Sequence, residues 1–290
     1  MRGAVLAVVA LGLFGVPVSA QTADEIIANY VKNTGGAERI QAIKTLRRTG
    51  KLTLGFGMDA VMVRENKRPN KVRQEFTLQG MTAVTAYDGR QGWKIEPFQG
   101  KKDPEALGEE ELKTILEDAD FDGPLIDYRQ KGSKVEFVGL EPVAGTDALK
   151  LKVTLKGGDV RYFYLDTDYY VPIKIETRRI VRGGEREYET TLGDYKSVGG
   201  VYLPHSFEIA AKGASEKQKF LYTKIEANVP IEDSRFHQPG NKQASGAKEE
   251  PPPKLPEKVS AAPALLHPAA PKIDSKRSPA WARETSARQP

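Results

Sequence analysis

Residues 148–155 read ALKLKVTL, and this stretch decides the fold class. Its apolar residues Leu149, Leu151, Val153 and Leu155 alternate strictly with polar ones. Successive side chains of a β-strand point to opposite faces, so one face of this strand is buried and the other meets water. Strands of this kind are typical of antiparallel sheets with one solvated face.

The same two-residue period recurs along most of the chain. Short turns separate the segments, and short connections place consecutive strands antiparallel, as in a β-meander. The predicted strands cover residues 46–54, 58–68, 71–78, 81–87, 91–96, 134–140, 148–155, 160–165, 171–179, 185–192, 201–209 and 217–225. Residues 21–239 hold this pattern, and they predict one α+β domain, mainly antiparallel β, with a sheet of about 11–12 strands.

Two short helices are expected before the first strand. Thr22 and Glu25 fit a capping box, apolar residues then recur at helical spacing, and Gly35-Gly36 ends the helix. A second short helix is expected at residues 37–44.

A helical insert is expected between the two groups of strands. Residues 103–130 break the β pattern, and Asp103-Pro104 is expected to begin a helix. The segment Phe121–Tyr128 is a second short apolar piece and is also expected to be helical.

A sheet this long is expected to curl, and its apolar face must be covered. The helices are too few to fill a closed core, which leaves two outcomes. They plug the sheet completely and give an inert fold, or they cover it loosely and leave an apolar cavity. The candidate ligand-binding residues that would line such a cavity are Met58, Ala60, Met62, Phe76, Met81, Ala83, Tyr87, Trp93, Leu112, Ile115 and Leu116. Core packing remains the alternative for each methionine.

The first residues are typical of a signal peptide. Residues 1–20 contain Arg2, then the apolar run Ala4–Val16, and small residues before a cleavage site that would leave Gln21 first. The apolar run is short for a membrane anchor, which is the alternative interpretation. The chain has no cysteine, which excludes disulfides and the lipid-modified cysteine of a lipoprotein. We therefore expect a soluble periplasmic or secreted protein.

The net charge of +5 does not indicate a nucleic-acid partner. Arg2 contributes one positive charge and residues 240–290 contribute four, so residues 21–239 sum to zero. A surface that follows phosphates needs clustered basic side chains. Residues 240–290 are rich in Pro, Ala and Lys, and they predict a disordered tail because they have too little apolar surface to offset their ordering entropy.

Calcium is not expected at the acidic segment Asp118-Ala-Asp120-Phe-Asp122-Gly123. It matches the first half of an EF-hand loop, but the twelfth position holds Arg129 where the loop needs a glutamate. The alternative is the end of a helix with solvated carboxylates.

No catalytic or metal motif is evident elsewhere in the sequence. The histidines, at positions 205, 237 and 267, lack ligand spacing, and His205 is expected to be structural. Neither a nucleophile elbow nor a phosphate-binding loop occurs. We therefore expect no enzyme and no cofactor.

Several stretches together resemble a known family. They are ADEIIANYVKNTGGAERIQAIKTLRRTGKL (23–52), YDGRQGWKI (87–95), YLDTDYYVPIKIE (164–176), YKSVGGVYLPHSFEI (195–209) and KIEANVPIEDSRF (224–236). In their order and spacing they resemble the periplasmic outer membrane lipoprotein-sorting proteins, the LolA/LolB-like superfamily. The resemblance spans about residues 23–238.

The resemblance implies a fold and a function. That family's fold is a strongly curved half-barrel sheet with a helical lid over an apolar cavity that holds acyl chains. Residues 21–239 would then be a carrier, or chaperone, for lipid or lipoprotein acyl chains, which contacts membranes transiently and catalyses nothing. The insert 103–130 and the first helix are the lid candidates. Relatives of this fold also act as envelope-stress sensors, so a protein-binding module of the envelope is the alternative.

Overall fold

The protein is described here from a computed structural model over residues 21–54, 57–181 and 184–240. The predicted signal peptide and nearly all of the predicted tail lie outside these described residues. The helices are α1 (Ala23–Thr34), α2 (Ala37–Ala42) and α3 (Glu109–Ala119), with the 3-10 turns η2 (Pro97–Gln99) and η3 (Asp233–Arg235). The strands are β1 (Thr45–Thr53), β2 (Asp59–Lys67), β3 (Lys71–Leu78), β4 (Met81–Tyr87), β5 (Gly92–Glu96), β6 (Lys101–Ala106), β7 (Lys134–Val143), β8 (Thr146–Thr154), β9 (Val160–Asp166), β10 (Pro172–Val181), β11 (Gly184–Val198), β12 (Val201–Ala211) and β13 (Gln218–Ala227).

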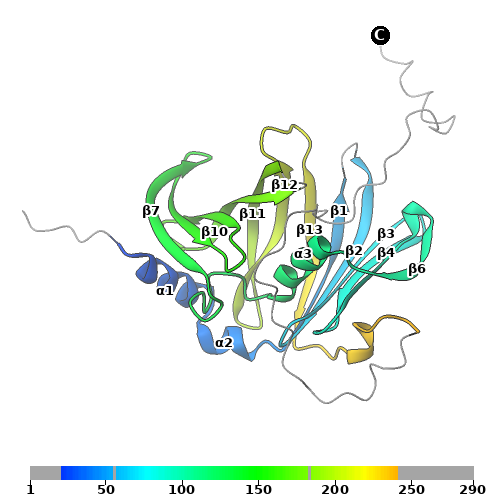
Figure 1. Ribbon diagram of the computed structural model, residues 1–290. Helices are drawn as coiled ribbons and strands as arrows, with labels where there is room; N and C mark the ends of the chain where they lie inside the picture. The colour runs from blue at the N-terminus through cyan, green and yellow to red at the C-terminus, as the bar shows by residue number, and fades with distance from the viewer. Residues whose placement is uncertain (1–20, 55–56, 182–183, 241–290) are drawn as a thin grey trace, which may run out of the picture.

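All strands belong to one antiparallel sheet of 13 strands in the order β6-β5-β4-β3-β2-β1-β13-β12-β11-β10-β9-β8-β7. The mainly antiparallel β prediction is confirmed, and each predicted strand is present. Two meanders meet where β1 pairs with β13 in the middle of the sheet. The edge strands are β6 and β7, which lie on opposite sides of the molecule (Figure 1).

The start of the predicted helical insert is wrong, because residues 101–106 form the additional strand β6 on the free edge of β5. An edge strand tolerates Pro104, since its outer side needs no N–H donor. Helix α3 begins only after Gly108, whose N–H donates to the Glu111 carboxylate at 3.1 Å.

The predicted helix at Phe121–Tyr128 is also wrong, because these residues form turns. Gly123 (φ 76°) and Asp127 (φ 52°) have left-handed backbone conformations, and Pro124 lacks an N–H.

The prediction for the first helix is confirmed. The Glu25 N–H donates to Thr22 Oγ1 at 3.3 Å, and the Thr22 N–H donates to the Glu25 carboxylate at 2.8 Å. The helix ends at Gly35, where φ is 137° and an added Cβ would lie 2.4 Å from the Gly200 carbonyl oxygen.

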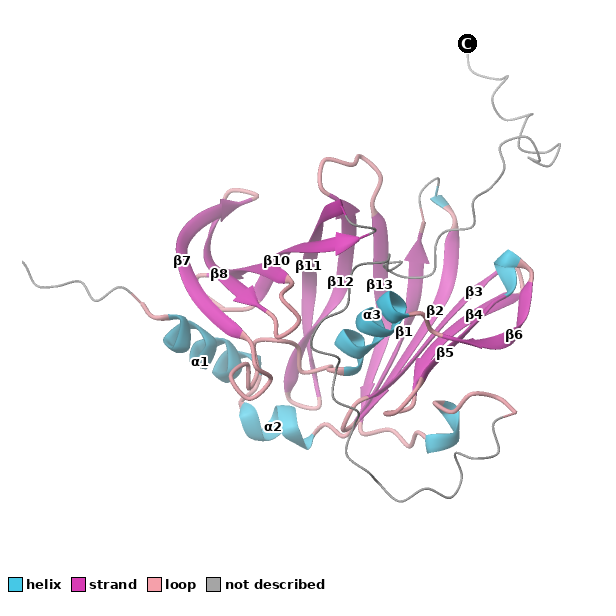
Figure 2. Cartoon of the chain, in the orientation of Figure 1, coloured by secondary structure: helices cyan, strands magenta, loops and turns pink. Residues whose placement is uncertain are grey.

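Helices α1 and α3 lie on the same face of the sheet, which we call the inner face. On β9, Phe163 packs in the cluster of α1, and Arg161 pairs with Glu117 of α3. Residues two apart on a strand share a face. The chain leaves β6 at one edge and enters β7 at the other, so the connection that contains α3 has to cross this face (Figure 2).

The expected strong curvature of the sheet is not found. The sheet is open and neither closed nor strongly curled. Each half packs against its own helix: Ile26 and Ile27 of α1 cover the β8–β9 side, and Ile115 and Ala119 of α3 cover the β3–β4 side. The two halves therefore do not have to close on each other. Within the described residues, no helix is long and apolar enough to cross a membrane.

Candidate functional site

The inner face carries an apolar cluster to which no helix among the described residues contributes. We call it the apolar patch. It consists of the buried residues Leu52, Leu54, Ala60, Met62, Phe76, Phe220 and Tyr222. Partly buried apolar side chains surround it, and these are Met58, Leu78, Phe207, Ile209 and Ile225. The ring of Phe207 meets that of Tyr222 edge to face, with 5.8 Å between centroids.

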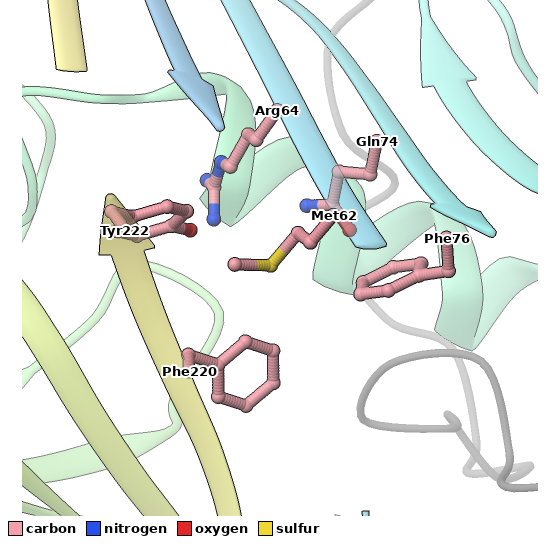
Figure 3. A pocket seen from close by; sticks show the side chains of 6 residues that line it. All are labelled: Met62, Arg64, Gln74, Phe76, Phe220 and Tyr222. Carbon is pink, nitrogen blue, oxygen red and sulfur yellow. The ribbon is translucent and has the colours of Figure 1, made fainter. Parts of the chain in front are cut away.

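A small pocket lies within the apolar patch. Its walls are side chains from β2, β3 and β13, which point toward a common space in Figure 3: Met62, Arg64, Gln74, Phe76, Phe220 and Tyr222. The pocket volume is about 10 Å³, which is room for about one water molecule. In this conformation the pocket is too small for an acyl chain.

Gly50 explains why the pocket is there. On β1 it stands between Met62 of β2 and Tyr222 of β13, so the middle of this row carries no side chain. A bulge at Thr49/Gly50 brings the backbones together, and an added Cβ at Gly50 would lie 2.0 Å from the Leu221 carbonyl oxygen.

Gly50→Ala is expected to lower the free energy of unfolding by about 1–3 kcal/mol, because the methyl group cannot fit without moving β13. Urea unfolding followed by circular dichroism would measure this. The matched variant Gly57→Ala, at a glycine whose added Cβ meets no atom within 4 Å but whose φ is 73°, carries only the backbone strain. Equal losses in the two variants would contradict the close approach at Gly50.

Next to the apolar patch lies a row of polar side chains that we call the polar row: Arg48, Arg64 and Gln74, aligned across β1, β2 and β3. Arg64 Nη2 donates to the carbonyl oxygen and to Oδ1 of Asp118, at 2.8 and 3.0 Å. Gln74 Nε2 donates to Asp118 Oδ2 at 2.8 Å. Burial lowers the pKa of Arg64. The Asp118 carboxylate raises it, and the net change is upward. The end of α3 is therefore fixed to the sheet by charge.

A second ion-pair group holds α3 from the other half of the sheet. Glu117 pairs with Arg161 of β9 and, at 2.8 Å, with Arg179 of β10. The side chain of Arg179 is only 4% exposed, and its Nη1 also donates to Thr114 at 3.3 Å. Through Glu117 and Asp118, α3 bridges strands that are far apart in the sheet.

The structure brings together many of the residues predicted to line a cavity. Met58, Ala60, Met62 and Phe76 belong to the apolar patch or its surroundings. Ala83 is the register partner of Phe76. A second group is the contact between Tyr87 of β4 and three residues of α3, which are Leu112, Ile115 and Leu116. Met81 begins β4 and is 41% exposed.

Trp93 does not join these residues, because it lies on the opposite, outer face. It packs with Val84 and Ala86, and its Nε1–H donates to the Phe236 carbonyl oxygen at 2.7 Å. The guanidinium of Arg73 lies 5.4 Å from its ring centre. The segment after β13 covers this part of the outer face, so both faces of β5 are buried.

The carboxylates of the acidic segment are not simply solvated, which corrects the expectation. Asp118 pairs with Arg64 at 3.0 Å, Asp120 with Lys131 at 2.7 Å, and Asp122 with Arg68 at 2.6 Å. The side chains of Arg64 and Lys131 donate further bonds to carbonyl oxygens of the same segment. The described residues contain no group of three or more metal-ligating side chains placed to hold an ion.

His205 is buried, and its Nδ1 lies 3.0 Å from the Leu203 carbonyl oxygen, in agreement with a structural role.

Several residues of the site were missed from the sequence. Phe220 and Tyr222 reach it only through the β1–β13 pairing, which joins distant parts of the chain. Arg48 and Arg64 could have been found from the sequence, because each occupies an inward position of its strand, where the alternation predicts an apolar residue.

No family model matches the sequence, and no curated protein matches it. Solved structures do match. One is a DUF1329 family protein from Desulfovibrio piger, 12% identical, with a TM-score of 0.53 over 74% of this chain and 97% of that one. Another is a LolA superfamily protein from Nitrosomonas europaea, 13% identical, with a TM-score of 0.51 over 75% and 98%. A third, described as an outer membrane lipoprotein-sorting protein domain from Vibrio parahaemolyticus, is 13% identical with a TM-score of 0.49 over 69% and 93%. At these identities the likeness is one of fold, and the chain shares its fold with the DUF1329 protein and the LolA superfamily protein.

Proposed function

We propose that this protein is a carrier that shields acyl chains of a lipid or lipoprotein from water on the apolar patch, without turnover. The observation that carries the proposal is the patch itself: seven buried apolar residues of the inner face, with no described helix packed on them. Each methylene moved from water into such a site contributes about 0.8 kcal/mol. The shared fold supports the proposal, since one protein with this fold is described as a LolA superfamily protein.

Helix α3 is the proposed lid. The pocket of about 10 Å³ must widen before an acyl chain can enter, so the proposal requires a second, open state. Glu117 and Asp118 hold α3 to both halves of the sheet through Arg161, Arg179 and Arg64. Lifting α3 would free Arg64 and Gln74, two walls of the pocket that Asp118 holds, and would let the pocket widen next to the apolar patch. A ligand that binds only this open state shifts the population toward it.

The proposed place of this work is the periplasm or the outside of the cell, as the signal peptide predicted at residues 1–20 indicates, because acyl chains must cross water there between membranes. Loading and release would then involve transient membrane contact.

The sheet edges give little support to the alternative of a module that binds a partner strand. Edge strand β6 contains Pro104, and edge strand β7 contains a bulge at Phe137/Gly139 as well as Pro142. Proline and bulges discourage the addition of another strand. These features favour the carrier over a strand-adding binding module.

The proposed function is tested by titrating the delipidated protein with a fluorescent acyl-chain probe. Met62→Gln is expected to weaken probe binding about tenfold, because the amide would face the acyl chain without a partner. The control is Leu151→Gln, in the cluster that α1 covers. Both variants bury an amide and should lose about 1–3 kcal/mol of stability. Only Met62→Gln should lose affinity. The carrier proposal fails if the folded wild type takes up no probe.

A further inference from the structure

The polar row contains a cation, Arg48, that forms no close ion pair among the described residues and is attracted by the Asp118 carboxylate only at longer range. Arg48 of β1 lies directly opposite Arg64 of β2 in the register, and like charges placed opposite each other on neighbouring strands repel. Arg64 meets Asp118, and the other arginines that face α3 meet Glu117. The hydrogen bond of Arg48 instead goes from its Nη1 to the amide oxygen of Asn66, at 2.8 Å.

The surroundings of Arg48 make its charge unfavourable. Its side chain is half-buried, and its register partner on β13 is the apolar Ile225. Burial, and then the positive charge of Arg64, lower the pKa of Arg48 to about 10. The group still carries its charge at neutral pH. An anion beside Arg48 would offset both the repulsion from Arg64 and the cost of burying the charge, because charge-assisted hydrogen bonds to a guanidinium are strong.

The inner face changes from polar to apolar in one direction along three neighbouring strands. From the polar row, β1 continues with Gly50 and Leu52, β2 with Met62 and Ala60, and β3 with Phe76 and Leu78. Along β1 the distance from residue 48 to residue 54 is about 20 Å at roughly 3.3 Å per residue, which is near the length of an extended membrane fatty acid. The polar row and the apolar patch therefore follow one another along the same three strands.

The polar end favours a small head group. Arg48 offers a single guanidinium to a ligand, since Arg64 and Gln74 of the polar row already donate to the Asp118 carboxylate. A carboxylate is compact, and it accepts two parallel hydrogen bonds from one guanidinium. The occupant that fits this charge, length and size is a long-chain carboxylate.

We propose, on the basis of the function proposed above, that the carrier site prefers a single-chain amphiphile that ends in a carboxylate. The carboxylate binds Arg48 at the polar row, and the chain lies along the apolar patch toward the hairpin between β1 and β2. Asn66 gives up its hydrogen bond with Arg48 and keeps the one that it donates to the Asp118 carbonyl oxygen at 2.9 Å.

The test compares palmitate with hexadecanol, which has the same chain and no charge, by calorimetric titration of the delipidated full-length protein. The wild type is expected to bind palmitate at least tenfold more tightly than hexadecanol. Arg48→Gln is expected to remove that preference while hexadecanol binding stays the same, and Arg48→Lys should keep part of it. The control is Arg47→Gln, the neighbouring arginine on the outer face, which pairs with Glu65 and should keep the full preference.

The outcomes separate this inference from the proposed function. Equal binding of acid and alcohol by the wild type overturns the carboxylate preference but leaves an acyl-chain carrier. Retention of the preference in folded Arg48→Gln overturns the role of Arg48. If neither compound binds, the proposed function and this inference are both wrong. The wild-type comparison holds even where a variant fails to fold.

Discussion

Glu117→Gln is expected to lower the free energy of unfolding by about 3 kcal/mol, because it removes the carboxylate shared by Arg161 and the buried Arg179. Breaking a buried ion pair leaves an uncompensated charge, and this is among the costliest single changes. Asp159 compensates only part of this charge, since its carboxylate lies 4.0 Å from Arg179 Nε and also pairs with Lys113 at 2.8 Å. Urea unfolding would give the loss of stability, and hydrogen exchange would report whether α3 opens locally.

The control for this prediction is Glu109→Gln, the same chemical change at an exposed position in the first turn of α3. It should cost less than about 1 kcal/mol, the usual size of a helix-dipole contribution. Losing Glu117 should also speed acyl-probe uptake, because α3 is the proposed lid. Equal stability losses in the two variants, with unchanged uptake, would show that the ion pairs do not hold α3.

Trp93→Ala is expected to lower the free energy of unfolding by about 3–5 kcal/mol, the range for removing a fully buried large aromatic side chain. The ring is completely buried, and the variant also loses its hydrogen bond to the Phe236 carbonyl oxygen. Limited proteolysis should then cut after β13, where the covering segment begins.

The same variant tests whether the acyl probe binds the inner or the outer face of the sheet. At a temperature where it remains folded, Trp93→Ala should bind an acyl probe as the wild type does, because Trp93 lies on the outer face. A folded variant that has lost probe binding would mean that Trp93 lines the site after all, as the sequence alone indicated.

Local chemistry explains what could be predicted. The two-residue period located the strands because most of them bury one face, and Thr22 with Glu25 fixed the start of α1. The strand β6 was missed because its sequence, KKDPEA, has no β-forming residues. Its pairing comes from the free edge that β5 offers.

The parts of the site that could not be predicted depend on long-range pairing. The contact between β1 and β13 brings Phe220 and Tyr222 to the apolar patch, and nothing near them in the sequence indicates this. Trp93 was predicted to line the cavity because it is a large aromatic residue, but it packs on the outer face. On β5 the apolar Trp93 and Ile95 alternate with Lys94 and Glu96, which indicates that Trp93 and Ile95 share a face but not that this face is the outer one.

Photo-crosslinking would show directly whether acyl chains lie on the apolar patch. Delipidated full-length protein would be irradiated with a fatty acid that carries a diazirine along its chain, and the labelled peptides would be mapped by mass spectrometry. Labels are expected in residues 52–54, 57–62, 74–78 and 218–222, and competing palmitate should remove them. Labels confined to the outer face around Val84 and Ile95, or no label that palmitate competes away, would contradict binding at the apolar patch.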